Sequence, residues 1–505
     1  MTTVFQNKFD GGHAEDIRTH NTDECEKSLN FDIFTNPHKL IPYADSIAET
    51  VSSGSMDEIE LSDVDISLIG SNYILTASGY ETGASTKIGF YTKSDITNGG
   101  VLNWSTQAVS ASGAYVKNSG VIFQTKFYAL ALSGGVYTLF RYNSGGSVTS
   151  IGTVTTSSSF YVKPFVHPSD KKLYGVIGQS IFQYDGSTFN KTGAGISLVL
   201  PSDYECTGLT NYGDYLAIGM RSLRGNGNSY VYLWDRQLTL VDANTCIDFG
   251  EGNLLILENL NESLFAVIQP QNTLPTTFTY KLKIRSYSGG SVETIKSIIL
   301  PSSNGVSAGL KVKNEEKLYF GLNNDDSLYV FGKNKTNRYV LAKHRYFFNG
   351  TTIGSAFQGL SMIGDIIWSG FTTVGGVYTL MRSKTLSHLG ETATYASVST
   401  YKTTINPAMP LADRYKNKQL EAVQVAFTGK NGGTIGLKYS VDGSTMTSLV
   451  SESTTAIEDT VSATAEYTDN LALLAGKEFQ FQIESTGGVE IKEIRYRYSV
   501  INEVV

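Results

Sequence analysis

Four segments near the C-terminal end of the chain alternate apolar and polar residues at a period of two. They are residues 420–427, 434–444, 478–485 and 489–500. Alternation at this period buries one face of a strand and leaves the other in water, which is typical of antiparallel sheets. Asp442-Gly443 predicts a tight turn between two of these strands. We therefore expect residues 400–505 to form a C-terminal β-sandwich, of jelly-roll or immunoglobulin-like type.

Residues 61–399 carry a longer repeat. A polar turn followed by a pair of aromatic or aliphatic residues recurs at steps of about 42 to 55 residues, close to the length of one four-stranded propeller blade. The apolar markers are Tyr73, Tyr128, Tyr174, Leu216, Phe265, Tyr319 and Ile367. The spacing predicts a β-propeller of about seven blades over residues 61–399.

Small residues accompany the marker strands, as expected where the inner strands of a propeller crowd around its axis. They are Ala129, Ala131, Gly175, Ala217, Gly219 and Gly321. A four-stranded sheet cannot bury both of its faces alone, so blades must stack on one another. Two alternatives stay open: a tandem of sandwich domains with coincidental spacing, and a parallel β-helix, whose period of about 20–25 residues is much shorter.

Residues 1–60 are rich in charged and polar side chains. Their one apolar stretch is FDIFTNPHKLIPY, residues 31–43, in which two prolines forbid a long helix or a central strand. We interpret the segment as an extended N-terminal arm that lies against another surface. The candidate interface residues are Phe31, Phe34, Pro37, Leu40 and Tyr43.

Composition strengthens the all-β prediction and limits the partners. The chain has 50 Gly, 30 Tyr and 24 Phe, which suit tight hairpins and pleated sheets. Charged residues make up only 17%, which suits a protein that packs against other proteins. The net charge of −7 lacks the basic footprint of a nucleic-acid-binding protein, so we expect no specific nucleic acid.

The N-terminus is polar, without the apolar core of a signal peptide, and no run of about 18 apolar residues predicts a membrane span. We therefore expect synthesis in the cytoplasm and release without the secretory route.

Cysteine and histidine spacing gives no sign of a metal site. Cys25, Cys206 and Cys246 fit neither a disulfide framework nor a CxxC pair, so we expect buried free thiols, with a Cys206–Cys246 bridge as the alternative. The histidines form no HxH or HExxH motif. They are His13, His20, His38, His167, His344 and His388.

Enzyme signatures are also missing, and we expect a protein without catalytic residues or cofactor. No GxSxG elbow, P-loop or dinucleotide fingerprint is present. The carboxylates of residues 62–67 and 323–327 are spaced closely enough for calcium, but hairpin tips explain them as well.

A propeller glycosidase needs a separate test. The Asp-box of sialidases is not repeated, and the arginines available to clamp a carboxylate follow different strands. These are Arg141, Arg221, Arg285 and Arg382. Sugar stacking on Trp104, Trp234 or Trp368 is an alternative to packing within the blades.

Two segments resemble virion proteins of tailed bacteriophages. The opening NKFDGGHAEDIR (residues 7–18), followed by FDIFTNPHKLIPY, resembles the N-termini of many such proteins. The chain end AGKEFQFQIESTGGVEIKEIRYRYSV (residues 475–500) resembles the last strands of the β-propeller tail-nozzle and head-to-tail stabilisation family. In that family, a basic strand like Ile494-Arg495-Tyr496-Arg497 closes a small β domain beside a propeller.

The resemblance covers the order of arm, propeller and sandwich across most of the chain. It implies a virion location and a homo-oligomeric ring around the tail axis, with the arm joining a neighbour or an adaptor. Its partners would then be other virion proteins of the tail, adaptor or capsid.

Three functions follow from these observations. The first is a non-enzymatic structural protein of the tail or head–tail junction. The second is a virion-surface decoration or host-adhesion protein whose sandwich binds a host surface glycan. The third is a propeller hydrolase or lyase that acts on glycans.

Overall fold

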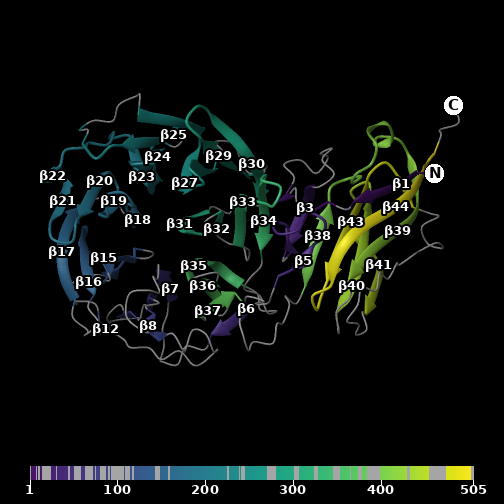
Figure 1. Cartoon of the computed structure of the whole chain (residues 1–505), viewed down its shortest axis with the longest axis horizontal. Helices are drawn as coiled ribbons and strands as arrows, with labels where there is room; N and C mark the ends of the chain where they lie inside the picture. Colours follow the sequence, from purple (N-terminus) through teal and green to yellow (C-terminus); the bar gives the residue numbers. More distant parts are fainter. Residues whose placement is uncertain are drawn as a thin grey trace. The chain divides into compact units, whose positions relative to one another are not determined.

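Figure 1 shows a computed structural model of the 505-residue chain. The structure describes residues 2–6, 8–9, 12–13, 24–29, 31–43, 46–49, 59–62, 72–73, 76–79, 87–88, 91–92, 107–108, 114–116, 119–124, 126–142, 148–156, 158, 160–224, 227–237, 239, 245–269, 280–300, 306–314, 316–322, 328–344, 353–363, 366–373, 378–383, 398–428, 433–453 and 474–501.

The chain divides into two compact units, and each is described by itself. The propeller unit is composed of Ile47–Asp326 and Gly350–Arg382. The sandwich unit is composed of Met1–Ser46, Ser327–Asn349 and Ser383–Val505. Among the residues that the structure describes, no helix has the length and apolar character needed to cross a membrane.

The propeller unit is a succession of antiparallel sheets. The first contains β7 (Ile59–Ser62), β9 (Thr76–Gly79), β10 (Lys87–Ile88) and β12 (Gln107–Ala108), and β8 (Asn72–Tyr73) pairs separately with β11 (Tyr91–Thr92). The second contains β13 (Ala114–Tyr115), β14 (Val121–Phe123), β15 (Lys126–Ser133), β16 (Val136–Tyr142) and β17 (Val148–Thr155). The third contains β18 (Tyr161–Val166), β19 (Leu173–Ile177), β20 (Ser180–Tyr184), β21 (Phe189–Thr192) and a short parallel strand, β22 (Gly195–Ile196).

Four further sheets follow in chain order. The fourth contains β23 (Tyr204–Tyr212), β24 (Tyr215–Ser222), β25 (Asn228–Trp234) and β26 (Cys246–Glu251). The fifth contains β27 (Asn253–Leu260), β28 (Ser263–Gln269), β29 (Tyr280–Tyr287) and β30 (Val292–Leu300). The sixth contributes β31 (Val306–Lys313) and β32 (Lys317–Leu322) to this unit. The seventh contains β35 (Ile353–Ile363), β36 (Ile366–Thr373), β37 (Tyr378–Ser383) and β6 (Ser46–Glu49).

These sheets follow one another around a ring. Contacts join β14 to β18, β18 to β23, β23 to β27, β27 to β31, β31 to β35 and β35 to β7. In Figure 1 the first strands β18, β23, β27, β31 and β35 lie toward the centre of the unit, and β17, β22 and β30 lie toward its rim. The predicted β-propeller of about seven blades is confirmed, and β6 closes the ring by adding an N-terminal strand to the last sheet.

Most of the marker residues lie in the second strands of the blades. Tyr73 lies in β8, and the other six lie in the second strands β15, β19, β24, β28, β32 and β36. The predicted small residues also lie on second strands, so they do not line the axis as expected. They make room for packing instead: a Cβ on Gly175 would fall 2.2 Å from the Phe182 ring, and one on Gly219 would fall 2.9 Å from Leu254 of the next sheet.

The sandwich unit packs two sheets face to face. One has the order β1 (Thr2–Gln6), β44 (Glu490–Val500), β39 (Lys418–Thr428) and β42 (Ala475–Gly476). In the other, β33 (Leu328–Lys333), β34 (Tyr339–His344), β3 (Glu24–Leu29), β38 (Ser399–Thr403), β43 (Phe479–Ser485), β40 (Thr434–Val441) and β41 (Thr447–Ser453) follow one another. The short β2 (Gly12–His13) pairs with β3, and β4 (Phe31–Asp32) pairs with β5 (Ile41–Pro42).

Aromatic side chains fill the space between these two sheets. The rings of Phe481 and Tyr496 lie 5.2 Å apart, and those of Phe9 and Tyr401 lie 5.4 Å apart. The predicted turn is also present, with positive φ at both Asp442 and Gly443. The C-terminal β-sandwich is therefore confirmed, with N-terminal strands in both of its sheets.

The predicted arm is extended, and the surface that it lies against is the chain's own sandwich unit. Strand β1 pairs with β44, β3 pairs with β38, and Leu40 exchanges two backbone hydrogen bonds with Ile491. Pairing of this kind buries apolar residues that a free arm would expose to water. The unit boundaries therefore differ from the predicted 60/61 and 399/400, since residues 47–60 belong to the propeller unit and residues 327–349 and 383–399 to the sandwich unit.

Candidate binding surface of the sandwich unit

Loop 404–417 joins β38 to β39, and the side chain of a buried lysine is hydrogen-bonded to its backbone. Lys418 is fully buried, and its Nζ donates to the carbonyl oxygens of Asp413 (3.1 Å), Arg414 (3.0 Å), Lys416 (2.8 Å) and Lys477 (2.6 Å). Burial lowers the pKa of Lys418 to about 8, so the ammonium group is still mostly charged at neutral pH. Charge-assisted hydrogen bonds of this kind fix the loop backbone around one cation.

An asparagine amide fixes the first half of the same loop. Asn406 has positive φ and exchanges two hydrogen bonds with the Phe479 backbone, through its own backbone N–H (2.7 Å) and its Oδ1 (2.9 Å). Its Nδ2 donates to the carbonyl oxygens of Arg414 (3.0 Å) and Lys477 (2.9 Å). Asparagine tolerates this backbone conformation better than most residues, so both its shape and its amide suit the position.

Two tyrosines of β44 complete the attachment. The Tyr496 hydroxyl donates to the Pro407 carbonyl, and the Tyr498 hydroxyl donates to Oδ2 of Asp413 at 2.9 Å. Burial, aided by the Asp413 carboxylate, raises the pKa of Tyr498 to about 12, so this phenol stays protonated at neutral pH. Thr2 of β1 lies opposite Tyr498, so the N-terminal strand supports the strand that holds the loop.

Apolar side chains point outward from this fixed loop. Leu411 and Tyr415 are 62% and 70% exposed. Ile501 is 40% exposed, and its backbone N–H donates to Asn417 at the end of the loop (2.9 Å). We name Leu411, Tyr415 and Ile501 the Leu411–Tyr415 patch. The loop is fixed while these large apolar side chains stay exposed, which makes it a candidate surface for contact with another protein.

Replacing Lys418 should loosen the loop. We expect Lys418→Met to lower the free energy of unfolding of the sandwich unit by about 2 kcal/mol, since it leaves carbonyl oxygens without their donor. All three tryptophans lie outside the sandwich unit, so hydrogen exchange of peptides from β39 is the suitable measurement. Lys416→Met is the matched control, because that side chain is 52% exposed and pairs only with Asp413. If peptides from β39 were equally protected from hydrogen exchange in the two variants, Lys418 would not stabilise the loop as proposed.

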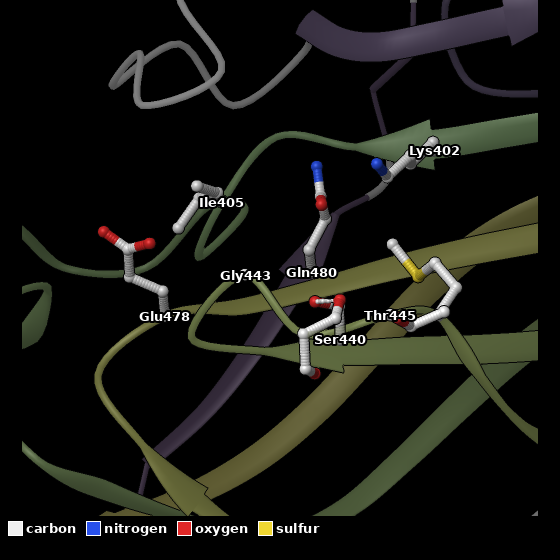
Figure 2. A pocket seen from close by; sticks show the side chains of 9 residues that line it. Lys402, Ile405, Ser440, Gly443, Thr445, Glu478 and Gln480 are labelled. Carbon is white, nitrogen blue, oxygen red and sulfur yellow. Dashed lines mark hydrogen bonds between the residues drawn. The ribbon is translucent and has the colours of Figure 1, made fainter.

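A pocket of about 360 Å³ lies beside this loop. Figure 2 shows Glu478 and Lys402 toward opposite ends of it, with Ile405 and Gln480 between them. Ser440, Gly443, Ser444, Thr445 and Met446 also line it. The described residues that line the pocket include no aromatic ring and a single carboxylate, so they offer hydrogen bonds but neither a sugar-stacking platform nor a carboxylate pair.

The pocket walls are fixed by hydrogen bonds. Oδ1 of Asp442 accepts from the backbone N–H groups of Lys477 (2.8 Å) and Glu478 (2.7 Å). Nε2 of Gln480 donates to the Thr403 carbonyl (2.8 Å), and the Ser440 hydroxyl donates to the Ser444 carbonyl (2.6 Å). These polar side chains therefore already have partners within the protein.

His167 is the centre of a polar cluster between the third and fourth propeller sheets. The side chain is fully buried, Nη1 of Arg236 lies 3.0 Å from Nδ1, and Nε2 lies 3.3 Å from the Tyr215 carbonyl. Arginine can only donate, so Nδ1 accepts and Nε2 carries the proton. Burial, with the Arg236 charge, lowers the pKa of His167. The Ser169 hydroxyl donates to Asp214 rather than to this ring, and the contacts of the cluster join the third sheet to the fourth.

A second cluster joins three blades through their first strands. Glu258 of β27 accepts from the Thr210 hydroxyl of β23 (2.9 Å) and from Lys311 and Lys313 of β31 (2.7 and 2.8 Å). Burial alone would raise the pKa of Glu258, but the two ammonium groups outweigh it and bring the pKa to about 2. The charged groups of this cluster therefore pair with one another across neighbouring blades.

Most of the predicted interface residues are buried within the chain itself. Phe31, Phe34 and Leu40 are buried, whereas Pro37 and Tyr43 are partly exposed. The Pro37 carbonyl accepts from the Phe9 backbone N–H. The three buried side chains are therefore not available to a neighbouring copy, which corrects the expected interface.

The cysteines are free, as expected. Cys25 and Cys206 are buried and Cys246 is partly buried, so the alternative Cys206–Cys246 bridge is not formed. Burial raises the pKa of Cys206 to about 12 and that of Cys246 to about 11, which leaves both thiols unreactive at neutral pH.

The predicted arginine candidates lie in different sheets with different partners. Arg221 pairs with Glu205, with its guanidinium 4.4 Å from the centre of the Phe160 ring, and Arg285 donates to the Phe249 carbonyl. Arg141 lies 3.5 Å from the Thr149 hydroxyl. These three do not converge on one ligand, and the side chain of Arg382 lies outside the described residues.

Several other candidates are only partly described. Trp234 packs against Tyr174 inside the propeller unit, as the packing interpretation predicts, and His38 is exposed. Trp104, His20, His388 and the carboxylates of residues 323–327 lie outside the described residues, as do residues 63–67. The same holds for the side chains of Trp368, His13 and His344. No group of three or more metal-ligating side chains occurs among the residues that the structure describes.

Sequence patterns did not single out Leu411, Tyr415 or Lys418. The only local signals were Pro407 and Pro410, which indicate a loop. Burial of Lys418 depends on carbonyl groups from a distant segment, so no local pattern reveals it.

Comparisons with known proteins give only distant structural likenesses. No protein-family model and no curated protein matches the chain. The AfRom2 CNH domain is 9% identical, with a TM-score of 0.40, over 69% of this chain and 100% of that one. The propeller domain of the Trilobed protease from Pyrococcus furiosus is 10% identical, with a TM-score of 0.38, over 67% and 95%. An exo-β-1,3-galactanase from Phanerochaete chrysosporium is 12% identical, with a TM-score of 0.30, over 90% and 100%.

Proposed function

We propose that this chain is a non-enzymatic structural protein of a tailed-phage virion. It serves in the tail or at the head–tail junction and assembles as a ring through protein–protein contacts. The observation that carries the proposal is the Leu411–Tyr415 patch, in which a loop fixed by Lys418, Asn406 and Arg414 holds apolar side chains outward. The resemblance of residues 7–18 and 475–500 to phage virion proteins supplies the location.

The polar chemistry of the described residues also supports a structural role. The His167 and Glu258 clusters join propeller blades, and their hydrogen bonds and ion pairs are made within the protein. The two described thiols with raised pKa values are unreactive at neutral pH.

Location in the particle is the test of this function. Antibodies against the purified chain should label intact particles at the tail or at the junction between head and tail in electron micrographs. Label spread over the capsid surface would favour the decoration protein instead. Absence of the chain from purified particles would contradict a virion role altogether.

A glycan screen separates the remaining alternatives. A host-adhesion protein should bind host surface glycans saturably, and the pocket in Figure 2 is its best candidate site. A hydrolase or lyase should release new ends from host polysaccharides. The structural proposal predicts neither result, since the described pocket lining offers neither an aromatic platform nor a carboxylate pair.

A further inference from the structure

We infer that the His167 cluster is a pH-sensitive contact, which releases Arg236 in mild acid and loosens the junction between the third and fourth sheets of the propeller unit. The switch does not depend on the virion role proposed above. It rests on a buried imidazole ring that joins the two sheets only while its Nδ1 atom accepts hydrogen bonds.

The ring is held on the third sheet by the turn that joins β18 to β19. The His167 backbone N–H donates to the Lys172 carbonyl (2.9 Å), and the Lys171 N–H donates to the His167 carbonyl (3.0 Å). Within the turn, the Ser169 backbone N–H lies 3.3 Å from Nδ1 of the ring and donates to it. Rotation of the ring out of this place would therefore break a hydrogen bond of the turn.

The same ring contacts two elements of the fourth sheet. Arg236 follows β25, and its Nη1 lies 3.0 Å from Nδ1. Nε2 donates to the carbonyl of Tyr215, the first residue of β24, at 3.3 Å. Beside the ring, the Ser169 hydroxyl donates to Asp214 in the turn between β23 and β24 (2.7 Å). Arg236 therefore contacts the ring only through a lone pair that a neutral imidazole has and an imidazolium lacks.

A proton on Nδ1 would turn this acceptor into a donor. The N–H groups of Ser169 and Arg236 would then face a third N–H group, so both hydrogen bonds would be lost. The imidazolium would also carry a positive charge next to the Arg236 guanidinium, which is charged at every pH of interest. Like charges repel strongly where water is excluded, and the His167 side chain is fully buried.

The carboxylate of Asp170 is shared between the two cations. Its Oδ1 lies 3.6 Å from Nδ1 of His167, and its Oδ2 lies 3.7 Å from Nη1 of Arg236. The Tyr174 hydroxyl also donates to Oδ2, at 2.6 Å. With His167 neutral, Asp170 balances Arg236 alone, and a second positive charge would leave one cation without a counter-charge.

The remaining groups around the ring set the direction of the pH dependence. Burial is the main cause that lowers the pKa of His167 below 6.5, and Arg236 adds to it, against the opposing effects of the Tyr215 carbonyl, Asp170 and Asp214. The unfolded state therefore takes up the proton first as the pH falls. The stabilisation by the cluster is complete above pH 6.5 and is lost as the pH falls below it, toward the lower pKa of the folded chain.

Arg236 is the group that leaves in acid. Its side chain is 21% exposed, so the guanidinium reaches water by a small movement, whereas the imidazole is fully buried. Nε2 keeps its proton in both charge states, so the bond to the Tyr215 carbonyl persists. Acid therefore releases the end of β25 from the third sheet first, which is a local opening of the propeller at one junction.

Hydrogen exchange of the full chain between about pH 8 and 5, the range in which histidine titrates, tests the switch. The reference is His167→Gln, whose amide can donate to Tyr215 but does not titrate. For peptides of residues 167–172 and of β24, the exchange rate of the natural chain divided by that of the variant should rise at least about threefold as the pH falls. The ratio for β27 and β28 of the fifth sheet should stay constant.

Two further variants separate the cluster from other effects of acid. His38→Gln replaces an exposed histidine of the sandwich unit and should respond to pH like the natural chain. Arg236→Met removes the facing cation, so Asp170 can pair with the imidazolium and the acid effect should shrink.

A ratio that stays constant for residues 167–172 and β24 would show that His167 is not the sensor and would overturn the switch. An Arg236→Met chain as sensitive to acid as the natural one would overturn it equally, and this comparison decides the question if His167→Gln does not fold. The virion role is decided separately, by the label on intact particles.

Discussion

A chain that lacks residues 1–30 should lose the cooperative structure of its sandwich unit. The deletion removes β1, which pairs with β44 over five residues from Thr2 to Gln6, and β3, which pairs with β38. It also removes Phe9, which is fully buried against Tyr401. One sheet thereby loses β1, the other loses β2 and β3, and the aromatic contact between Phe9 and Tyr401 is lost. We therefore expect loss of folding rather than a small shift in stability.

Hydrogen exchange measures this loss directly. Peptides from β39 and β44 should exchange at least about a hundredfold faster in the truncated chain. A synthetic peptide of residues 1–30, added in trans, should restore part of the protection, because it supplies the missing strands. A chain extended at its N-terminus by a polar tag is the control and should exchange like the natural one. Unchanged protection after the deletion would contradict the N-terminal contribution to the sandwich.

Glu258→Gln should destabilise the propeller unit by about 3 kcal/mol at neutral pH. The change removes the charge that Lys311 and Lys313 share, and the Lys311 side chain is only 17% exposed. Removing one partner of a largely buried ion pair leaves the other charge without compensation. Urea unfolding followed by tryptophan fluorescence suits the test, because all three tryptophans belong to the propeller unit.

Two further variants test whether loss of the Glu258 charge causes the destabilisation. Lys313→Met, which removes a lysine that is 39% exposed, should cost less than about 1 kcal/mol. The double variant Glu258→Leu with Lys311→Met should recover most of the loss, because it leaves no buried charge. A double variant as unstable as the sum of its single changes would contradict the pairing.

The same carboxylate should make stability depend on pH. The pKa of Glu258 is about 2 in the folded chain and near 4.5 when unpaired, so the unfolded state takes up the proton first as the pH falls. The stabilisation is therefore complete above pH 4.5 and is lost between pH 4.5 and 2. The natural chain should lose stability more steeply than Glu258→Gln in this range, and parallel curves would exclude Glu258 as a source of the dependence.

Periodic apolar patterns predicted the fold well, because a propeller repeats the same packing problem in every blade. Tyr128, Tyr174, Leu216 and Phe265 are all buried in the second strands of successive sheets, so their spacing follows the repeat of the blades. The Asp442-Gly443 turn was also predictable, because few residue types adopt the positive φ angles that it requires.

The long-range pairings were not predictable in this way. The register of Thr2 with Tyr498 joins residues at opposite ends of the chain, and nothing in either segment specifies the other. The same holds for Lys418, whose carbonyl partners include Lys477. The sequence therefore predicted which apolar residues anchor the arm, namely Phe31, Phe34 and Leu40. It did not predict that the surface they pack against belongs to the sandwich unit of the same chain.

The account depends most on the pairing of the two chain ends in one sheet, which supports the loop that carries the patch. Cysteines at Thr3 and Arg497, which lie opposite each other in β1 and β44, test it in a chain whose three natural cysteines have been replaced. Oxidation of Thr3→Cys/Arg497→Cys should give a high yield of disulfide within single chains, found by mass spectrometry of the linked peptides, whereas Thr3→Cys with Lys492→Cys should give little. Absence of the bond, or its formation only between chains, would contradict the account.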